Sequence, residues 1–375
     1  MCYNASYTNL VYFMSGRKKK LRNYLKYGIY LQKQAIKMSI ETTSTISIIL
    51  LCCITLIIAD LAISGLVHIM AGISFKRAFL TGLWTLLLPP VFTAYGSLIG
   101  RNLYKTEVVH LEFENLPASF DGYRIVHISD LHARSYEHRH SSLQKAVTEI
   151  NGADPDLIVF TGDLITLVPE EVDSISYILK ETKARDGIYS ILGNHDYGIY
   201  ADRQSGNRSS IKENIGKLLE KEKEIGWNPL TNQAAVISRG TDSIAVVGVE
   251  NTSASRHFPS RGRLDEASAG TEGLFRILLS HDPMHWDMEI RGKDYPLTLS
   301  GHTHAMQLSL LGWSPSSLIF KQNKGLYSSK GQYLYVNTGL GETIFPARIG
   351  ARPEITLIIL KKKDSRNQAS VSLAR

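Results

Sequence analysis

The sequence predicts an α/β fold in which two mixed β-sheets pack on each other and are flanked by helices, preceded by an N-terminal transmembrane helical hairpin. Three observations lead to this class. From Val108 onward, short β-rich runs first alternate with amphipathic helices and later follow one another directly. Five of these runs end in Asp, Asn or His. Before Val108, two apolar stretches are long enough to cross a bilayer.

A chain of 375 residues can bury a sizeable core, but its charge is unevenly spread. Residues 1–45 hold eight Lys or Arg and a single acid, Glu41, whereas the remaining bases and acids cancel. The body therefore lacks a uniformly basic surface, and we expect no nucleic-acid partner. All three cysteines, Cys2, Cys52 and Cys53, precede residue 54. Residues 54–375 can therefore form neither a disulfide nor a Cys-based zinc site.

Residues 1–45 form a basic N-terminal segment with apolar positions at roughly helical spacing. This segment is either a solvated, partly helical extension or a juxtamembrane stretch held against anionic headgroups. Met38 is an alternative start, since the residues before it have little globular character.

Two apolar runs within residues 46–100 predict two transmembrane helices, at about 46–69 and 79–99. The first run contains Asp60, which we expect to face another helix because a carboxylate in lipid costs roughly 2.5–3.5 kcal/mol. Pro89 and Pro90 predict a kink in the second run. One span with a re-entrant or interfacial segment is the alternative. A transporter built on Asp60 is disfavoured, because two spans enclose no path without oligomerisation.

The bases before Ile46 place the N-terminus in the cytoplasm, and two spans return the chain to that side. We therefore expect a multi-pass protein of the cell (inner) membrane, with the lipid bilayer as a partner and the body in the cytoplasm. Lys76 and Arg77 in the short loop argue against this orientation, and a single span would reverse it. A secretory signal peptide fits poorly, because the apolar run begins late and is too long.

The body is expected to cover residues 101–361 and to be followed by a polar tail, 362–375. Its expected strands are 108–113, 123–128, 157–160, 188–192, 235–238, 244–249, 275–279, 297–299, 333–336 and 355–360. Its expected helices are 142–150, 172–183, 210–225 and 283–289. The early strands form βαβ units, and the later strands come mostly without helices between them.

The polar clusters at the ends of five strand-like runs predict one convergent metal site. They are Asp130-Leu131-His132, Gly162-Asp163, Gly193-Asn194-His195-Asp196, Ser280-His281-Asp282 and Gly301-His302-Thr303-His304. His302 and His304, at i and i+2 of an extended backbone, project to the same side. Each residue alone has a simpler explanation, since a lone Asp is usually a helix N-cap, a lone Asn a turn residue and a lone His an ordinary side chain.

The ordered set Asp-x-His, Gly-Asp, Gly-Asn-His-Asp, His and Gly-His-x-His resembles the calcineurin-like metallophosphoesterase superfamily, over roughly residues 123–360. With the N-terminal membrane segments, the chain is similar to the membrane-anchored bacterial phosphoesterases of that superfamily. Residues 187–193 and 337–341 add to the match. The resemblance implies a four-layer αββα metallophosphatase fold over residues 101–361 and a hydrolase with a binuclear metal centre that acts on phosphoric ester bonds.

Oxygen and imidazole ligands of this kind suit Mn, Fe or Zn, and two such metals can hold a hydroxide between them for attack on phosphorus. The resemblance makes Asp163 the bridging ligand. It gives each metal three ligands of its own: Asp130, His132 and His304 for one, and Asn194, His281 and His302 for the other. His195 then lies on the substrate side, where it stabilises phosphoryl oxygens or protonates the leaving alkoxide, and Asp196 would orient its imidazole.

Two positions depart from the pattern of many relatives. Thr166 stands where they carry a second acid, and Arg134 where they often carry Gly. Arg134 either grips a phosphate bidentately or is a solvated loop residue. His138 and His140, in a basic loop after the first motif, are further candidates for substrate binding at the mouth of the site.

The sequence thus predicts a membrane-anchored, metal-dependent phosphoesterase that hydrolyses a phosphodiester or pyrophosphate bond. A lipid or lipid precursor is the favoured substrate, because the anchor keeps the site near the bilayer. Four aromatic residues downstream of the His pair either form an apolar opening suited to lipid or belong to the core: Trp313, Phe320, Tyr327 and Phe345. The alternatives are a general or nucleotide phosphodiesterase whose membrane segment is only an address, and a non-catalytic metal-binding membrane scaffold. The oligomeric state is left open.

Overall fold

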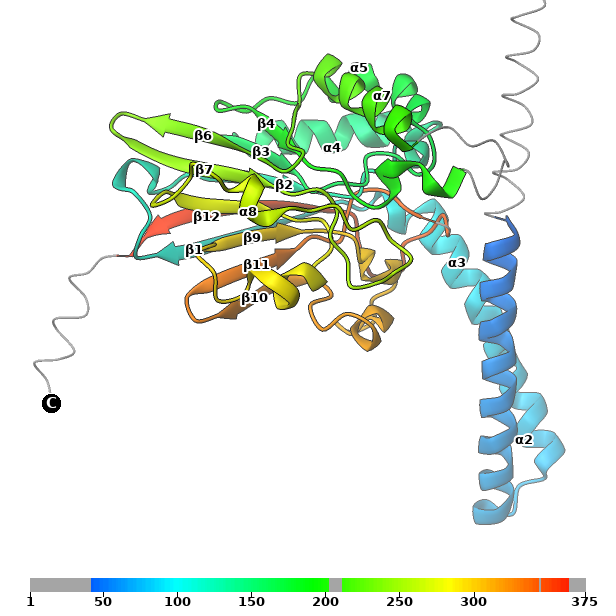
Figure 1. The fold of residues 1–375 in the computed structure, drawn as a ribbon. Coiled ribbons are helices and arrows are strands. Elements are labelled where there is room, and N and C mark those ends of the chain that lie inside the picture. Colours follow the sequence, from blue (N-terminus) through cyan, green and yellow to red (C-terminus); the bar gives the residue numbers. More distant parts are fainter. Residues whose placement is uncertain (1–41, 202–210, 344, 364–375) are drawn as a thin grey trace, which may run out of the picture. The chain divides into compact units, whose positions relative to one another are not determined.

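The computed structural model describes residues 42–201, 211–343 and 345–363 (Figure 1). The chain divides into two compact units, Met1–Val91 and Phe92–Arg375. The last turns of the second apolar helix therefore belong to the unit that contains the sheets. Nearly all of the expected basic segment (1–45) and polar tail (362–375) lies outside the described residues, and the domain boundaries stay predictions.

Two helices, Thr42–Ala71 and Phe75–Asn102, are long and apolar enough to cross a membrane, with mean hydropathies of 2.8 and 1.4. In the first unit, Cys53 contacts the carbonyl of Leu86, and the Asp60 carboxylate lies against Gly82, where a Cβ would overlap it. These two pairs run in opposite chain directions, as in an antiparallel hairpin. Ser64 donates a hydrogen bond of 3.4 Å to Asp60. The prediction that Asp60 faces another helix is confirmed.

The second apolar helix changes type next to its proline pair. It runs as α2 (Phe75–Gly82), a 3₁₀ turn (Leu83–Leu87) and α3 (Leu88–Leu98). In a continuous α-helix, Pro89 and Pro90 would clash with the carbonyls of Thr85 and Leu86 and leave them without donors. Both carbonyls lie within the 3₁₀ turn, where the α-helical bonding is already interrupted. The helix therefore changes type just before the prolines, and the kink predicted there stays a prediction.

Both sheets of the second unit are mixed and have six strands in the described residues. The first has the order β1-β12-β2-β3-β4-β5 and the second the order β10-β11-β9-β8-β7-β6. The first comprises β1 (Lys105–Phe113), β2 (Arg124–Ile128), β3 (Leu157–Phe160), β4 (Ile188–Ser190), β5 (Asn228–Pro229) and β12 (Glu354–Lys362). The second comprises β6 (Gln233–Arg239), β7 (Asp242–Gly248), β8 (Phe275–Leu279), β9 (Leu297–Ser300), β10 (Gly325–Ser329) and β11 (Gln332–Val336).

Alternating side chains of the strands build three layers of core. On β2, Ile125 lies between the two sheets, whereas Val126 packs under the helices of the first sheet. On β7, Val246 likewise lies between the sheets, and Val247 packs on the outer side of the second sheet. The outer helices are α4 (His140–Gly152), α5 (Ser176–Leu179) and α7 (Ile211–Glu224) beside the first sheet, and α8 (Leu264–Ala267) in the outer core of the second (Figure 1). The predicted fold class, two mixed sheets flanked by helices, is confirmed.

Several expected elements differ in detail. The helix expected at 172–183 is a 3₁₀ turn, Pro169–Ser174, followed by the short α5, because Pro169 fits the first position of an earlier turn. The helix expected at 283–289 is a single π turn, Trp286–Ile290. The edge strands β5 and β10 were not predicted, since β5 has only two residues and β10 is rich in Gly and Ser.

Parallel strands of both sheets direct their following loops to one region. β2, β3 and β4 are parallel neighbours in the first sheet, and β8 and β9 in the second. Carboxyl ends of parallel strands lie at the same edge of a sheet, which is where α/β proteins place their ligands. The five polar clusters follow these five strands.

Glu222 of α7 is a buried acid beneath the first sheet, with 1% of its surface exposed. The Ser190 hydroxyl donates to one carboxylate oxygen, and the other has no hydrogen-bond partner among the described residues. Burial raises the pKa of Glu222 to about 8, so the folded protein keeps this group protonated at neutral pH.

Glu222→Gln is expected to stabilise the fold more and more as pH rises from 4.5, the ordinary pKa, to about 8. Because the pKa of Glu222 is raised in the folded state, the free energy of unfolding of the wild-type protein falls by up to about 1.4 kcal/mol per pH unit in this window. The amide of the variant does not titrate, so the variant has no such loss. Thermal unfolding at pH 5 and pH 8.5 measures the gain. Glu220→Gln, at an exposed position of the same helix, is the control. An equal response of both variants would contradict the assignment.

Candidate metal centre

All seven predicted ligands lie together in the loops that follow the five parallel strands. Five are under 3% exposed or fully buried, and His302 and His304 are nearly so. The structure groups their carboxylate oxygens and ring nitrogens in three sets, with donor atoms within 4.8 Å of one another. The sets are Asp130, His132 and His304; His132, Asp163 and His195; and Asp163, His281 and His302.

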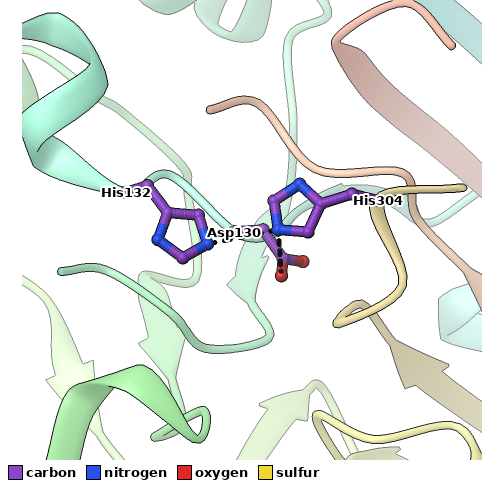
Figure 2. A group of neighbouring side chains, drawn as sticks. All are labelled: Asp130, His132 and His304. Carbon is purple, nitrogen blue, oxygen red and sulfur yellow. Dashed lines mark hydrogen bonds and ion pairs between the residues drawn. The ribbon is translucent and has the colours of Figure 1, made fainter. Parts of the chain in front are cut away.

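The first set combines the loop after β2 with the loop after β9. His304 Nε2 lies 3.2 Å from Asp130 Oδ1 and 3.1 Å from His132 Nε2. Figure 2 shows the two imidazoles turned toward each other, with the carboxylate beside them. The three side chains thus present two nitrogens and one carboxylate oxygen to the same small volume.

The set Asp163, His281 and His302 is centred on His281, which follows β8. Its Nε2 lies 3.2 Å from Asp163 Oδ2, from Asn194 Oδ1 and from His302 Nδ1. Asp163 Oδ2 is also 3.8 Å from His132 Nε2 of the first set. One carboxylate, that of Asp163, is therefore shared between the two groups of donors.

Backbone strain is concentrated in the loops that carry these donors. Five of the seven have a positive φ, between 46° and 73°: Asp130, His132, Asp163, His302 and His304. The left-handed conformation continues from His304 through Gln307. For residues other than glycine it costs roughly 1–2 kcal/mol each and is found mainly where function requires it.

The donor set fits divalent metal ions. Two carboxylates, four imidazoles and one amide meet at 3.1–3.2 Å in a buried volume, which is costly for charged groups unless a counter-charge is present. Carboxylate, carbonyl oxygen and imidazole together suit Mn, Fe or Zn, whereas Cu(I) prefers sulfur.

Electrostatics keeps the carboxylates ionised. Burial raises the pKa of Asp163, but the adjacent His281, His195 and His132 outweigh burial and hold it well below its ordinary value. Burial likewise lowers the pKa of His281, but Asp163 and Asp130 outweigh burial and raise it to about 10. The negative charge that favours a proton on His281 is the charge that a cation would neutralise.

His195 lies beside the shared carboxylate and is more exposed than the predicted ligands around it. Its backbone N–H donates to Asp163 Oδ1 at 2.8 Å. Its ring Nδ1 is 2.9 Å from the carbonyl oxygen of Thr166, and since a carbonyl only accepts, Nδ1 carries the proton. The Tyr200 ring stacks on the imidazole at 4.3 Å. These contacts leave Nε2 as the nitrogen that can meet a ligand.

The prediction that Asp196 orients His195 is wrong. The Asp196 carboxylate accepts hydrogen bonds from the backbone N–H groups of Asp163, Ile165 and Gly193, at 2.8, 3.1 and 2.8 Å. The orienting partner of the imidazole is instead the Thr166 carbonyl. A carboxylate was the more obvious partner in the sequence, but the backbone amides of two loops compete for it. Asp196 thus ties the loop after β3 to the loop after β4.

The three predicted substrate-binding residues follow the first motif, Asp130–His132, along the chain. Arg134 follows in the turn Ala133–Tyr136 and acts electrostatically on Glu171. His138 is exposed, and His140, at the start of α4, contacts the Tyr177 hydroxyl at 3.1 Å through Nδ1. Neither histidine belongs to the three donor sets of the described residues. Their roles in substrate binding stay predictions.

Sequence reasoning gave no role to Asp282, although it directly follows His281. Asp282 Oδ2 lies 3.9 Å from His302 Nε2, while His302 Nδ1 faces His281. The same oxygen is buried and has no hydrogen-bond partner among the described residues. A carboxylate behind a ligating imidazole commonly fixes its orientation. Asp282 lies behind His302, but at 3.9 Å it makes no hydrogen bond to the imidazole.

Two further residues that support the cluster carry no signal in the sequence. Tyr200 accepts a hydrogen bond of 2.9 Å from Asn194 Nδ2, which turns the amide oxygen of Asn194 toward His281. Arg348 is fully buried, donates to the carbonyls of Thr338, Gly341 and Ala351, and has Nη2 3.3 Å from His304 Nδ1.

The aromatic residues downstream of the His pair do not act as one group. Phe320 meets the His302 ring edge-on at 5.5 Å, and Phe258 does the same at 5.2 Å. Tyr327 packs against the outer core of the second sheet, whereas Trp313 is 54% exposed. Phe320 therefore lies beside the predicted ligands, whereas Tyr327 belongs to the core.

Residues 123–306 match the family described as calcineurin-like phosphoesterase, and this range contains all seven predicted ligands. An uncharacterized metallophosphoesterase of Bacillus subtilis, YkuE, is 29% identical over 76% of this chain and 97% of that protein. A transmembrane protein with metallophosphoesterase domain from Danio rerio is 33% identical over 78% of this chain, but only 64% of that protein. UDP-2,3-diacylglucosamine pyrophosphatase LpxG of Chlamydia trachomatis is 28% identical over 69% of this chain and 90% of that protein.

Gly301→Ala is expected to at least halve the metal content of protein loaded with Mn²⁺. A Cβ at Gly301 would overlap Ser129 Oγ and a carboxylate oxygen of Asp130, so this ligand must move. Elemental analysis of the purified full-length protein measures the bound metal. Gly216→Ala, with no atom within 4 Å of the added Cβ, should keep its metal and gain roughly 0.5–1 kcal/mol of stability. Full metal content in Gly301→Ala would contradict the role of Asp130.

Proposed function

We propose, because this chain belongs to the calcineurin-like phosphoesterase family, that it hydrolyses a phosphodiester or pyrophosphate bond on a membrane lipid or lipid precursor. Family membership and the clustered donors make the chain a metal-dependent phosphoester hydrolase. The type of bond, the lipid substrate and the residue roles below are our proposal.

The position of Asp163 is the observation that carries this proposal. Its Oδ2 lies 3.2 Å from His281 and 3.8 Å from His132, so it serves both donor sets. Two metal ions held in this way would supply a water of lowered pKa and neutralise charge on the phosphoryl group. We assign Asp130, His132 and His304 to one ion, and Asn194, His281 and His302 to the other.

His195 is the proposed catalytic residue that is not a metal ligand. The Thr166 carbonyl fixes its Nδ1–H, so Nε2 can donate to a phosphoryl oxygen or give a proton to the leaving alkoxide. Stacking of Tyr200 limits rotation of the ring. Asp196 contributes indirectly, since its bonds to the backbone amides of Asp163 and Gly193 join the two loops that carry Asp163 and His195.

Three observations favour a lipid substrate. The chain carries two helices apolar enough to cross a membrane. Phe258 and Phe320 place aromatic edges against the ligand His302. A relative with 28% identity is named as a pyrophosphatase of UDP-2,3-diacylglucosamine, a nucleotide-linked acylated sugar. We propose a multi-pass protein of the cell (inner) membrane with the catalytic unit on the cytoplasmic side.

Asp163→Asn is expected to lower turnover by about 100-fold or more, because loss of the shared carboxylate weakens both metal sites. The assay uses full-length protein reloaded with Mn²⁺ and compares bis-(p-nitrophenyl) phosphate with diesters that carry acyl chains. Asp265→Asn, at a side chain that is 95% exposed, is the matched control and should keep full activity. Hydrolysis by Asp163→Asn at the wild-type rate would refute the proposal. Equal turnover of soluble and acylated diesters would point to a general phosphodiesterase.

His195→Gln is expected to keep its metal and to lose about 10²- to 10⁴-fold in kcat, as for removal of a general acid. The loss should be smaller for a p-nitrophenyl ester than for an alkyl ester, because nitrophenolate leaves without protonation. Metal content and kcat are measured on the same preparation. If the variant loses metal to the same extent as Asp163→Asn, His195 is a ligand and not the acid.

A further inference from the structure

The segment that follows His304 exposes many large apolar side chains. Seven residues, each between 37% and 100% exposed, form what we call the apolar rim: Met306, Leu308, Leu310, Leu311, Trp313, Leu318 and Ile319. Soluble proteins expose single apolar residues freely, but a contiguous patch usually marks a binding surface. On the described strands of the two sheets, exposed apolar residues are scattered, for example Val108, Val236 and Leu326.

The tip of the rim is a tight hairpin turn with an unusual residue. Leu310 and Trp313 exchange two backbone hydrogen bonds, of 2.8 and 2.9 Å, around Leu311 and Gly312. Both central residues are left-handed, with φ of 49° and 86°. The first central position of such a turn favours Asn, Asp or Gly. Here it holds a leucine that is fully exposed, so neither backbone preference nor burial against the described residues accounts for it.

The rim is bonded to residues 346–350. Ser309 N donates to the Ile349 carbonyl, and Ile349 N donates to the Gln307 carbonyl, both at 2.8 Å. Gly350 packs so closely on Ser309 that a Cβ would overlap its carbonyl oxygen. Backbone hydrogen bonds therefore join the rim to residues 346–350.

Residues 346–350 are in turn bonded to the end of the second apolar helix, in the same compact unit. Arg348 N donates to the carbonyl of Gly96 at 3.2 Å, and Arg101 donates to the carbonyl of Pro346 at 3.0 Å. Gly100 packs against the Arg348 carbonyl, where a Cβ would overlap it. The apolar rim is thus held beside residues 96–101, at the end of a helix that can span a membrane.

The surface continues in apolar side chains along that helix end. Phe92, Tyr95, Leu98 and Ile99 are 42–75% exposed. A bilayer that covers these residues reaches its interface near the end of the helix, where Trp and Tyr are preferred. Trp313 on the rim and Tyr95 on the helix are residues of the kind that is preferred at this interface.

Basic side chains accompany the rim. Lys321, with 74% of its side chain exposed, directly follows Phe320, and Lys324 donates to Ser309 Oγ at 2.8 Å. Burial and the neighbouring Lys105 lower the pKa of Lys324, so Lys105 and Lys324 lie near each other. Apolar residues flanked by lysines bind bilayers that contain anionic lipids.

We propose that the apolar rim docks on the surface of the bilayer that holds the N-terminal helices. The partner is the interface of that membrane, because the rim continues the apolar end of a membrane-type helix and lysines border it. The rim leads through Phe320 to His302, so docking brings the metal cluster to the level of lipid headgroups. Only this last consequence rests on the proposed function.

The test places a single spin label on the full-length protein in nanodiscs that contain anionic lipid, at one chain per disc. Cys2, Cys52 and Cys53 are replaced by Ser, and Leu311→Cys carries the nitroxide. Tyr177→Cys, at an exposed apolar position on α5, is the matched control. We expect the label at 311 to be accessible to oxygen and at least five-fold less accessible than the control to a water-soluble nickel chelate.

Equal accessibility of the two labels to the nickel chelate would overturn the docking proposal. Protection that appears only with two chains per disc would also overturn it, because the rim would then be a contact between copies. Metal content of both labelled proteins shows that they are folded. Since no hydrolysis is measured, a failure of docking is distinct from a failure of the proposed function.

Discussion

The two buried carboxylates, Asp130 and Asp163, constrain everything around them. A buried carboxylate stays ionised only with partners of opposite charge or strong donors, and here four imidazoles and several backbone amides fill that role. No single loop supplies these partners. The fold brings them together by ending five parallel strands of two sheets in the same region. The double sheet is therefore a means of assembling short loops around two negative charges.

The loops tolerate strain because other bonds determine their shape. Left-handed residues at five of the seven ligands cost several kcal/mol together. Asp196 offsets part of this by bonding three backbone amides, and Arg348 by bonding three carbonyls. The Asp163 and Asp130 carboxylates pack directly against Gly193 and Gly301, where a Cβ would overlap them. Strain and rigidity of this kind are typical of sites that are formed before their ligand arrives.

The clustering of these donor side chains was predictable because each donor follows a strand, and strand ends can be read from hydrophobic patterns. Periodicity also gave the mixed sheets, though not β10, whose small residues show no alternation. The supporting contacts were less accessible. His195 is oriented by a backbone carbonyl, which any residue at position 166 would supply. Tyr200 and Arg348 reach the cluster from segments without a motif. Asp196 was predicted to bond His195, because the sequence shows the carboxylate but does not show the backbone amides that compete for it.

Arg348 belongs to two parts of the molecule at once. Its backbone N–H is bonded to Gly96 in the last turns of the apolar helix, and its guanidinium lies against the predicted ligand His304. The last turns of the apolar helix are thus bonded to a residue that contacts the predicted metal centre. A soluble fragment that begins at residue 101 would lack the Gly96 carbonyl and the packing around Gly100. Such a fragment would be an altered enzyme, and the native properties of this protein are those of the chain in its membrane.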